Sequence, residues 1–338
     1  MAKSDRYRER MSRRSVLLLL LSVGLSLMPI RSPAPLVYNP GEGWTYEAVG
    51  GVGKWKRETA KEQMAVTQAA YDQHNYTLAR KSASRLIRTW PLSDYAPNAQ
   101  YLVGLCYEAE HEDERAFKAY QLVFEKYPRS DKLADVVQRQ YQIGLRFLGG
   151  QRFKLLGLVP FLPDMDKTAG MFEKIVASGP YSAVGPSAQL SIGAARDRQK
   201  NYPEAVAAYE RAADRYHDLP AIAADAQYRA GFAYSKQAQS AGYDQGTAGQ
   251  AIATFTDFMA LFPNDPRVNE AKRIIVVLKE EQSRGNYMIA TFYENQKRWN
   301  GALIYYNEVL VQGPNSRYAS VARERIDQIK KYIAGTPP

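Results

Sequence analysis

Few residues in this sequence are of a type that performs chemistry by itself. The chain of 338 residues has one cysteine, Cys106, and three histidines, His74, His111 and His217. A single cysteine excludes a disulfide framework and a cysteine-based metal site. Cys106 lies in the apolar run YLVGLCY, where a cysteine usually packs as a small apolar residue, and His111 lies in EHEDER, which lacks the HExxH spacing. No nucleophile elbow or phosphate-binding loop is present either. We therefore expect no metal, no cofactor and no enzymatic activity.

The elements that carry the remaining polar side chains form an internal repeat. Six times, a helical pattern centred on a small residue is followed by a second one centred on alanine, with proline usually twelve positions after the alanine. The clearest copy is Gly104 to Pro128, GLCYEAEHEDERAFKAYQLVFEKYP. Small residues let two helices approach closely, and proline ends the second helix. The small residues are Thr67, Gly104, Gly144, Gly193, Gly231 and Ala290, and the alanines are Ala79, Ala116, Ala169, Ala205, Ala251 and Ala302.

These offsets resemble tetratricopeptide repeats over roughly residues 60–315. The resemblance implies an all-α fold, a right-handed superhelix of about six stacked helical hairpins with a concave groove. Residues 318–333 are expected to form a helix that caps the open end. In such units the residue three before the small one faces the groove, and these positions hold Met64, Tyr101, Tyr141, Leu190, Tyr228 and Tyr287.

Four of these six positions are tyrosines. A tyrosine presents a large apolar ring and a hydroxyl group at low conformational-entropy cost, which suits recognition of extended peptides. Tyr71 adds a further ring in the first unit. The alternative is that these rings pack within the superhelix and bind nothing.

Two hairpins are longer than the others. The small residue and the alanine are 12 apart in four units, 25 apart in the third and 20 apart in the fifth. The third insertion, 149–164, is apolar, and we expect Leu158, Val159, Phe161 and Leu162 to contact a membrane or a partner, unless the segment folds back. The fifth, QAQSAGYDQGTAGQ, is predicted to be a flexible loop. Residues 267–299 are predicted to form one long helix.

The N-terminus has the layout of an export signal. Residues 1–14 carry six basic residues against two acidic ones, and the apolar run Val16–Met28 contains no charge. This run of 13 residues is shorter than the ~20 that a membrane-spanning helix needs. The pair Arg13-Arg14 also resembles a twin-arginine signal. Pro35 follows the small residues Ser32 and Ala34, so we expect cleavage to be hindered, and residues 1–35 to form a signal peptide or an uncleaved signal anchor.

The rest of the chain is then divided into three parts. Residues 36–59 are expected to be an extended tether, 60–180 the N-terminal repeats with the insertion, and 181–338 the C-terminal repeats with the long helix and the cap. The formal net charge is +10 for the whole chain and +5 without residues 1–35, and the excess is dispersed. Nothing indicates a nucleic-acid partner.

Several segments together narrow the resemblance to one family. The export signal, WPLSDYAPNAQYLVGLCYEAEHEDERAFKAYQLVFEKYP, LLGLVPFLPD and AKRIIVVLKEEQSRGNYMIATFYENQKRWNGALIYYNEVL look like BamD-type outer-membrane assembly factors over about residues 60–333. The resemblance implies a periplasmic scaffold at the inner face of the outer membrane that binds the barrel-forming BamA and other assembly subunits, and helps to fold β-barrel proteins. By position, Tyr71, Tyr101 and Tyr141 would face unfolded barrel substrates, and Tyr228, Arg284 and Tyr287 would face the partner.

The sequence departs from this family in one respect. Typical members are lipoproteins whose signal is followed by an acylated cysteine, whereas no cysteine precedes Cys106 here. Membrane association would then come from the partner or from an uncleaved signal. Two other classes stay open: a periplasmic repeat adaptor of the Tol-Pal or cell-division coordinator type, although residues 36–59 show no heptads, and a secretion or polysaccharide-export adaptor.

Overall fold

The computed structural model describes residues 36–39, 43–46, 55–155, 159–160, 163–240 and 244–335. In these residues it contains the thirteen helices α2–α14 and four short strands. The chain divides into two compact units, residues 1–127 and 128–338. The predicted all-α fold of stacked helical hairpins with a C-terminal helix is confirmed.

The first unit holds two helical hairpins. They are α2 (Ala60–Asp72) with α3 (Tyr76–Thr89), and α4 (Ala96–Ala109) with α5 (Asp113–Lys126). In the predicted tether, β1 (Leu36–Asn39) pairs antiparallel with β2 (Gly43–Tyr46), with Leu36 opposite Tyr46.

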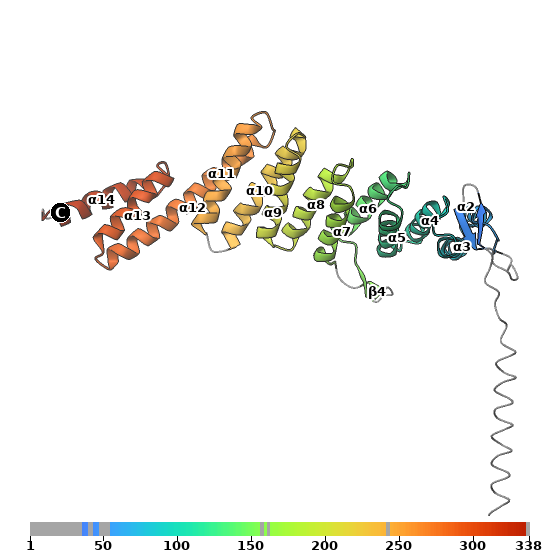
Figure 1. The fold of residues 1–338 in the computed structure, drawn as a ribbon. Helices are drawn as coiled ribbons and strands as arrows, with labels where there is room; N and C mark the ends of the chain where they lie inside the picture. Colours follow the sequence, from blue (N-terminus) through green and yellow to red (C-terminus); the bar gives the residue numbers. More distant parts are fainter. Residues whose placement is uncertain are drawn as a thin grey trace, which may run out of the picture. The chain divides into compact units, whose positions relative to one another are not determined.

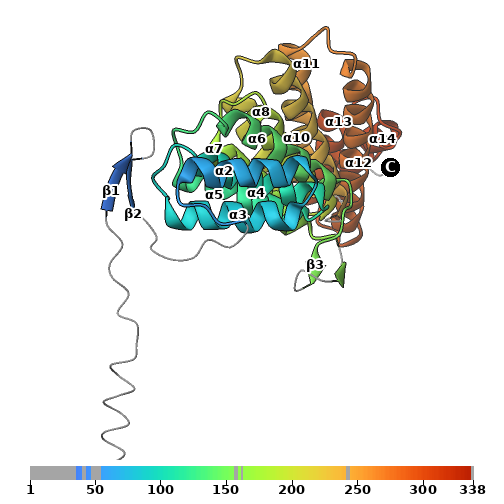
Figure 2. The same cartoon turned by 90° about the vertical axis from the view of Figure 1, so that its right-hand side faces the viewer.

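The second unit is also built of helical hairpins, from α6 to α14 (Figure 1). Its hairpins are α6 (Leu133–Leu148) with α7 (Met165–Ser178), α8 (Gly185–Arg198) with α9 (Tyr202–Arg215), α10 (Pro220–Ser240) with α11 (Gln245–Leu261), and α12 (Val268–Asn295) with α13 (Trp299–Gln312). Helix α14 (Ala319–Ile333) packs on α13. The strands β3 (Lys154–Leu155) and β4 (Val159–Pro160) project from the α6/α7 hairpin (Figure 2).

Local sequence signals set the helix boundaries. The side chains of Thr59, Asn75 and Asp164 accept hydrogen bonds from backbone N–H groups three residues later, at 3.2, 3.1 and 3.0 Å, and so cap α2, α3 and α7. Prolines in the first turn of α4, α8 and α9 cost no intrahelical hydrogen bond. Four of the hairpin turns contain a residue with φ near +60°: His74, His111, Lys200 and Lys297. The predicted helix-turn-helix spacing is therefore achieved by ordinary caps and tight turns.

From the second hairpin onward, the small residue of the first helix makes room for a ring from the second helix. In the first hairpin the Thr67 hydroxyl instead donates to the Ser82 hydroxyl at 2.9 Å. A Cβ atom on Gly104 or Gly193 would overlap the ring of Tyr120 or Tyr209, respectively, and one on Gly144 would lie 2.7 Å from the Phe172 ring. These rings are buried, and they fill the space between the two helices.

The Phe172 contact corrects the predicted register of the third unit. In the four other hairpins that contain such a ring, it lies four residues after the alanine, as Tyr120 does after Ala116, but Phe172 lies three after Ala169. Thr168, which is fully buried, takes the place of the alanine, and Pro180 then falls at the expected twelfth position. The insertion is one residue shorter than predicted.

The fifth insertion is also different from the prediction. It was expected to be a flexible loop, but α10 extends to Ser240 and α11 begins at Gln245. Ala238 and Ala248, which lie inside the predicted loop, are buried against Leu278 of α12. The Asp244 carboxylate accepts from the N–H groups of Gly246 and Thr247 and starts α11. Burial of the alanines and this cap outweigh the glycine content of the segment.

Several predictions fall on residues outside the described part of the chain. These include the export signal, residues 1–35, and three of the four apolar residues of the third insertion, Leu158, Phe161 and Leu162. Val159 lies in β4, and only its backbone is described. Their predicted contacts stay predictions.

Candidate partner-binding surfaces

The predicted groove tyrosines share one packing arrangement. Each is half-buried, and its ring lies beside the ring that its own hairpin places against the small residue. The centroid distances are 5.9 Å for Tyr101–Tyr120, 5.9 Å for Tyr141–Phe172, 5.7 Å for Tyr228–Phe255 and 5.8 Å for Tyr287–Tyr306. These rings therefore pack within the hairpins on one side and are solvent-accessible on the other. Their role in binding stays a prediction.

Tyr71 differs from the other tyrosines. Its ring lies 5.8 Å from Tyr76, and it packs beside Ala70, Ala79 and Cys106. Burial raises the pKa of the Cys106 thiol to about 11, so this cysteine is an unreactive part of the same cluster.

Tyr228 is the tyrosine with the most elaborate surroundings. It lies in a pocket of about 270 Å³ that is lined mostly by α10, with Asp197 of α8, Tyr209 of α9 and Arg267 at the start of α12. The Tyr228 ring stacks on Phe232 at 6.4 Å and 13°, and the Arg267 guanidinium lies 4.7 Å from its centroid. This guanidinium–ring contact is a cation–π interaction. Burial raises the pKa of Tyr228 to about 12, and a hydrogen bond with Glu270 adds to the shift.

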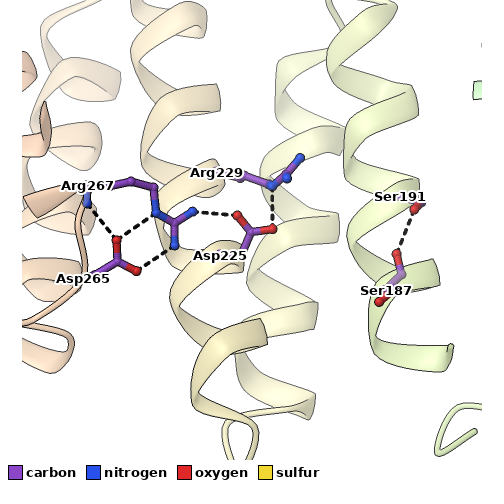
Figure 3. Close-up of polar contacts among 6 residues, drawn as sticks. All are labelled: Ser187, Ser191, Asp225, Arg229, Asp265 and Arg267. Atoms are coloured by element: carbon purple, nitrogen blue, oxygen red, sulfur yellow. Dashed lines mark hydrogen bonds and ion pairs between the residues drawn. The ribbon is translucent and has the colours of Figure 1, made fainter. Parts of the chain in front are cut away.

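A network of ion pairs holds the charged walls of this pocket (Figure 3). Arg267 pairs with Asp265 at 2.9 Å and with Asp225 at 2.7 Å, and Asp225 also pairs with Arg229 at 2.8 Å. Lys236 pairs with Asp197 at 2.8 Å. The charges are therefore largely balanced, and the pocket presents aromatic faces between fixed polar groups.

The Arg267–Asp225 pair fastens α12 to α10. The Asp265 carboxylate accepts from the Arg267 backbone N–H and side chain, and this guanidinium lowers the pKa of Asp265. On the neighbouring α8, the Ser191 hydroxyl donates to the Ser187 carbonyl at 2.8 Å (Figure 3). The ion pairs of Arg267 with Asp265 and Asp225 therefore fix its guanidinium over the Tyr228 ring before any partner binds.

A second candidate surface is an exposed stripe on α12. Val277, Met288 and Phe292 have 57, 59 and 60% of their surface exposed. With Arg284 they fall at spacings of seven, four and four, so they share one face of the helix. We call these four residues the α12 stripe. The Arg284 guanidinium pairs with Glu281 at 2.6 Å and also donates to the Met288 sulfur at 3.9 Å.

Tyr287 lies beside this stripe and has a structural role as well. Its ring is 5.8 Å from Tyr306 and 5.3 Å from Tyr318, so it joins α12, α13 and the start of α14. The described contacts connect Tyr228 with Arg267 and Tyr287 with Tyr318, and no described contact joins the two sites. The predicted partner residues therefore occupy two places on the second unit.

Sequence reasoning missed a polar ladder inside the hairpins. Gln100 and Gln189 donate to the carbonyls of Ala119 and Ala208, at 2.9 and 3.1 Å, and so join the two helices of their hairpins. The signal was present, because an amide residue precedes every small residue by four positions. These residues are Gln63, Gln100, Gln140, Gln189, Gln227 and Asn286.

A second missed pattern links ring hydroxyls with acids. Tyr120 donates to Glu108 at 2.8 Å and Tyr306 to Glu294 at 2.6 Å, and each acid lies four residues after the small residue. Where the second-helix ring is Phe172 or Phe255, that position holds Leu148 or Ser235.

In the residues that the structure describes, no helix combines the length and the hydropathy needed to cross a bilayer. The fold defines the chain as a helical-repeat protein, and the two surfaces are its candidate binding sites.

Comparison with known families refines this class. Residues 163–313 match the YfiO family, described as outer membrane lipoprotein, and residues 68–131 match a tetratricopeptide repeat. The two matches support a tetratricopeptide-type family of outer-membrane lipoproteins. Both candidate surfaces, the Tyr228 pocket and the α12 stripe, lie within the residues of the first match. No curated protein matches the chain.

Solved structures of repeat proteins are also similar to the chain. The C-terminal part of a repeat protein from Cytophaga hutchinsonii is 15% identical, with 79% of this chain and 88% of that chain covered and a TM-score of 0.36. MamA from Desulfovibrio magneticus RS-1 is 16% identical, with 64% and 99% covered and a TM-score of 0.31. PilW, a type IV pilus biogenesis factor, is 13% identical, with 79% and 99% covered and a TM-score of 0.27.

Proposed function

We propose that the protein is a non-enzymatic periplasmic scaffold of the machinery that assembles β-barrel proteins at the inner face of the outer membrane. Its C-terminal repeats bind a BamA-like barrel protein, and its N-terminal repeats receive segments of unfolded barrel proteins. The observation that carries the proposal is the family match over residues 163–313, the region that contains the α12 stripe. Attachment to the membrane comes from this partner or from an uncleaved signal.

The α12 stripe has the composition of a protein interface. Exposed Met288 and Phe292 follow a charged pair, Arg284 with Glu281, along α12, and interface cores are enriched in aromatic residues, methionine and arginine. An exposed phenylalanine is costly in water, since burial of such a side chain contributes about 1.5–3 kcal/mol. Binding of a partner to this face would remove that apolar surface from solvent.

The Tyr228 pocket supports the same partner. Its rings are fixed by Arg267 and by packing on Phe255, so a bound segment loses little side-chain entropy on the scaffold side. Tyr71, Tyr101 and Tyr141 are the proposed contacts for unfolded substrate, because part of each ring surface is accessible beside the packed face. The rest of each ring supports the fold, so substitutions there need a stability measurement beside the binding measurement.

The partner half of the proposal is tested by titrating the purified protein with the periplasmic part of the BamA-like protein of the same organism. Replacement of Phe292 by alanine should weaken binding about tenfold, which is typical of a central interface residue. Leu261→Ala is the matched control, since Leu261 is 65% exposed on α11, away from the stripe. Equal affinities for the wild type and Phe292→Ala, or equal losses in both variants, would contradict the assignment.

The substrate half requires a separate assay with a peptide from a barrel strand. The double substitution Tyr101→Ala and Tyr141→Ala should weaken peptide binding more than it lowers thermal stability, and should leave binding of the BamA-like partner unchanged. Unchanged peptide binding together with lowered stability would leave these tyrosines only a packing role.

A further inference from the structure

A groove on the first unit is not explained by the proposed function. It has a volume of about 620 Å³ and is lined by α3, α4 and α5, with Ile87, Val103 and Leu122 supplying one apolar side chain from each helix. We call it the basic groove. Tyr71 and Tyr101 are not among its lining residues.

Four basic residues border the basic groove, and no acidic residue lines it. Arg88, Arg115, Lys118 and Lys126 are all exposed. In the described part of the chain, none of the four takes part in an ion pair, whereas the nearby Arg80 pairs with Glu110. Arg115 lies over the Tyr107 ring at 6.0 Å. Four uncompensated positive charges around an apolar floor create a local potential that attracts negative charge.

The second unit contains the equivalent groove with a different charge. It has a volume of about 450 Å³ between α7, α8 and α9, and Val176 and Ile192 occupy the positions of Ile87 and Val103. Glu173 lines this groove together with Arg211 and Arg215, and Ala177 stands where Arg88 stands in the first unit. The apolar floor is thus shared by the two grooves, whereas a border with no acidic residue distinguishes the basic groove from its α7/α8/α9 equivalent.

We propose that the basic groove binds an acidic amphipathic helix of a partner protein. Apolar side chains of that helix would pack on Ile87, Val103 and Leu122 between α3 and α5, in the way that a helix docks into a hydrophobic groove. Its carboxylates would pair with Arg88, Lys118 and Lys126 along the edges. The apolar floor favours such a helix over a nucleic acid, whose phosphates would leave the floor uncovered.

The test is fluorescence anisotropy with the full chain and a labelled synthetic helix that carries leucines on one face and glutamates on the other. We expect saturable binding, weakened at least about tenfold by Lys118→Glu combined with Lys126→Glu, since like charges then oppose each other across the contact. Arg211→Glu combined with Arg215→Glu, in the equivalent groove, is the matched control and should change the affinity less than about twofold. Circular dichroism confirms that each variant is folded.

Two further arms separate docking from general charge attraction. A scrambled peptide of the same composition, with no apolar face, should bind at least about tenfold more weakly. A single-stranded oligonucleotide should fail to displace the amphipathic peptide. The proposal is overturned by absence of saturable binding up to roughly 1 mM, by equal losses in the two pairs of variants, by equal binding of the scrambled peptide, or by efficient displacement with the oligonucleotide.

Discussion

Hairpins α4/α5 and α8/α9 have the same internal framework. In each, a glycine accommodates the ring of a tyrosine, Gly104 with Tyr120 and Gly193 with Tyr209. In each, a buried glutamine of the first helix donates its side-chain amide to the carbonyl of an alanine in the second helix. These pairs are Gln100 with Ala119 and Gln189 with Ala208. The shared residues are internal, so they fix how the two helices pack.

The outer surfaces of the two hairpins differ. The groove beside α4/α5 is bordered by basic residues alone, whereas the groove beside α8/α9 contains both Glu173 and Arg211. The framework therefore leaves the outer positions available for recognition. Changes to the framework should affect stability in both hairpins alike, and changes to the lining should affect binding in one place only.

The largest expected effect comes from filling the space that the ring occupies. In Gly104→Ala the new methyl group overlaps the Tyr120 ring. Overpacking costs about 1–3 kcal/mol, and the better helix propensity of alanine returns roughly 1 kcal/mol. We expect a net loss of up to about 2 kcal/mol in the free energy of unfolding, measured by urea denaturation, and a similar loss for Gly193→Ala.

Two other glycines serve as controls for this effect. The nearest ring atom would lie 3.0 Å from a Cβ on Gly231, so Gly231→Ala should be nearly neutral. Gly170 in α7 has no atom within 4 Å of that position, and Gly170→Ala should stabilise by about 0.5–1 kcal/mol. If Gly104→Ala were as stable as Gly170→Ala, the close ring contact would be disproved.

A smaller effect is expected from the hydrogen bond between Tyr120 and Glu108. Tyr120→Phe removes a 2.8 Å hydrogen bond and should cost about 1 kcal/mol. The third hairpin has Phe172 and Leu148 at the positions of Tyr120 and Glu108. A double variant that combines Tyr120→Phe with Glu108→Leu copies this pair and should recover part of the lost stability. A double variant no more stable than Tyr120→Phe would show that the ring hydroxyl and the acid are not coupled.

The smallest expected effect is a pH dependence in the second unit. The hydrogen bond from the Arg267 side chain lowers the pKa of Asp265 below the ordinary value of an aspartate. The stabilisation is therefore complete above that value and is lost as the pH falls through the lower folded-state pKa. Asp265→Asn should be less stable than the wild type by about 0.5 kcal/mol at neutral pH.

This difference should shrink as the pH is lowered from about 6 to about 3, because protonation removes the same charge from the wild type. Urea titrations of both proteins across this range provide the measurement. A constant difference would mean that Asp265 contributes through packing or hydrogen-bond geometry and not through its charge.

The sequence predicts the repeats well because their signals are local and repeated. Small residues such as Gly104 and the prolines at fixed distances mark the hairpins, and the helices begin at residues such as Asn75 that cap well. The register failed at Ala169, because two small buried residues, Thr168 and Ala169, stand side by side. The contact of Phe172 with Gly144 distinguishes them, and Pro180, twelve residues after Thr168, is the sequence signal that agrees with it.

The candidate surfaces are harder to predict because they depend on several helices at once. The Tyr228 ring was placed correctly on a first helix, but its partner Arg267 is 39 residues away along the chain and meets it only through packing of α12 on α10 and α11. The predicted loop around Gly242 became mostly helical because Ala238 and Ala248 pack on a later helix. Arg115, Lys118 and Lys126 share one face of α5, but only the packing of α3, α4 and α5 brings them together with Arg88 around one groove.

The most direct test of the central claim is fractionation of the native protein, tagged at its C-terminus, before and after depletion of the BamA-like protein. The account predicts that the protein co-purifies with the outer membrane and with this partner, and that depletion reduces its share in the outer-membrane fraction. A role in barrel assembly would be contradicted if the protein were recovered without the BamA-like protein, either free in the periplasmic fluid or together with Tol proteins.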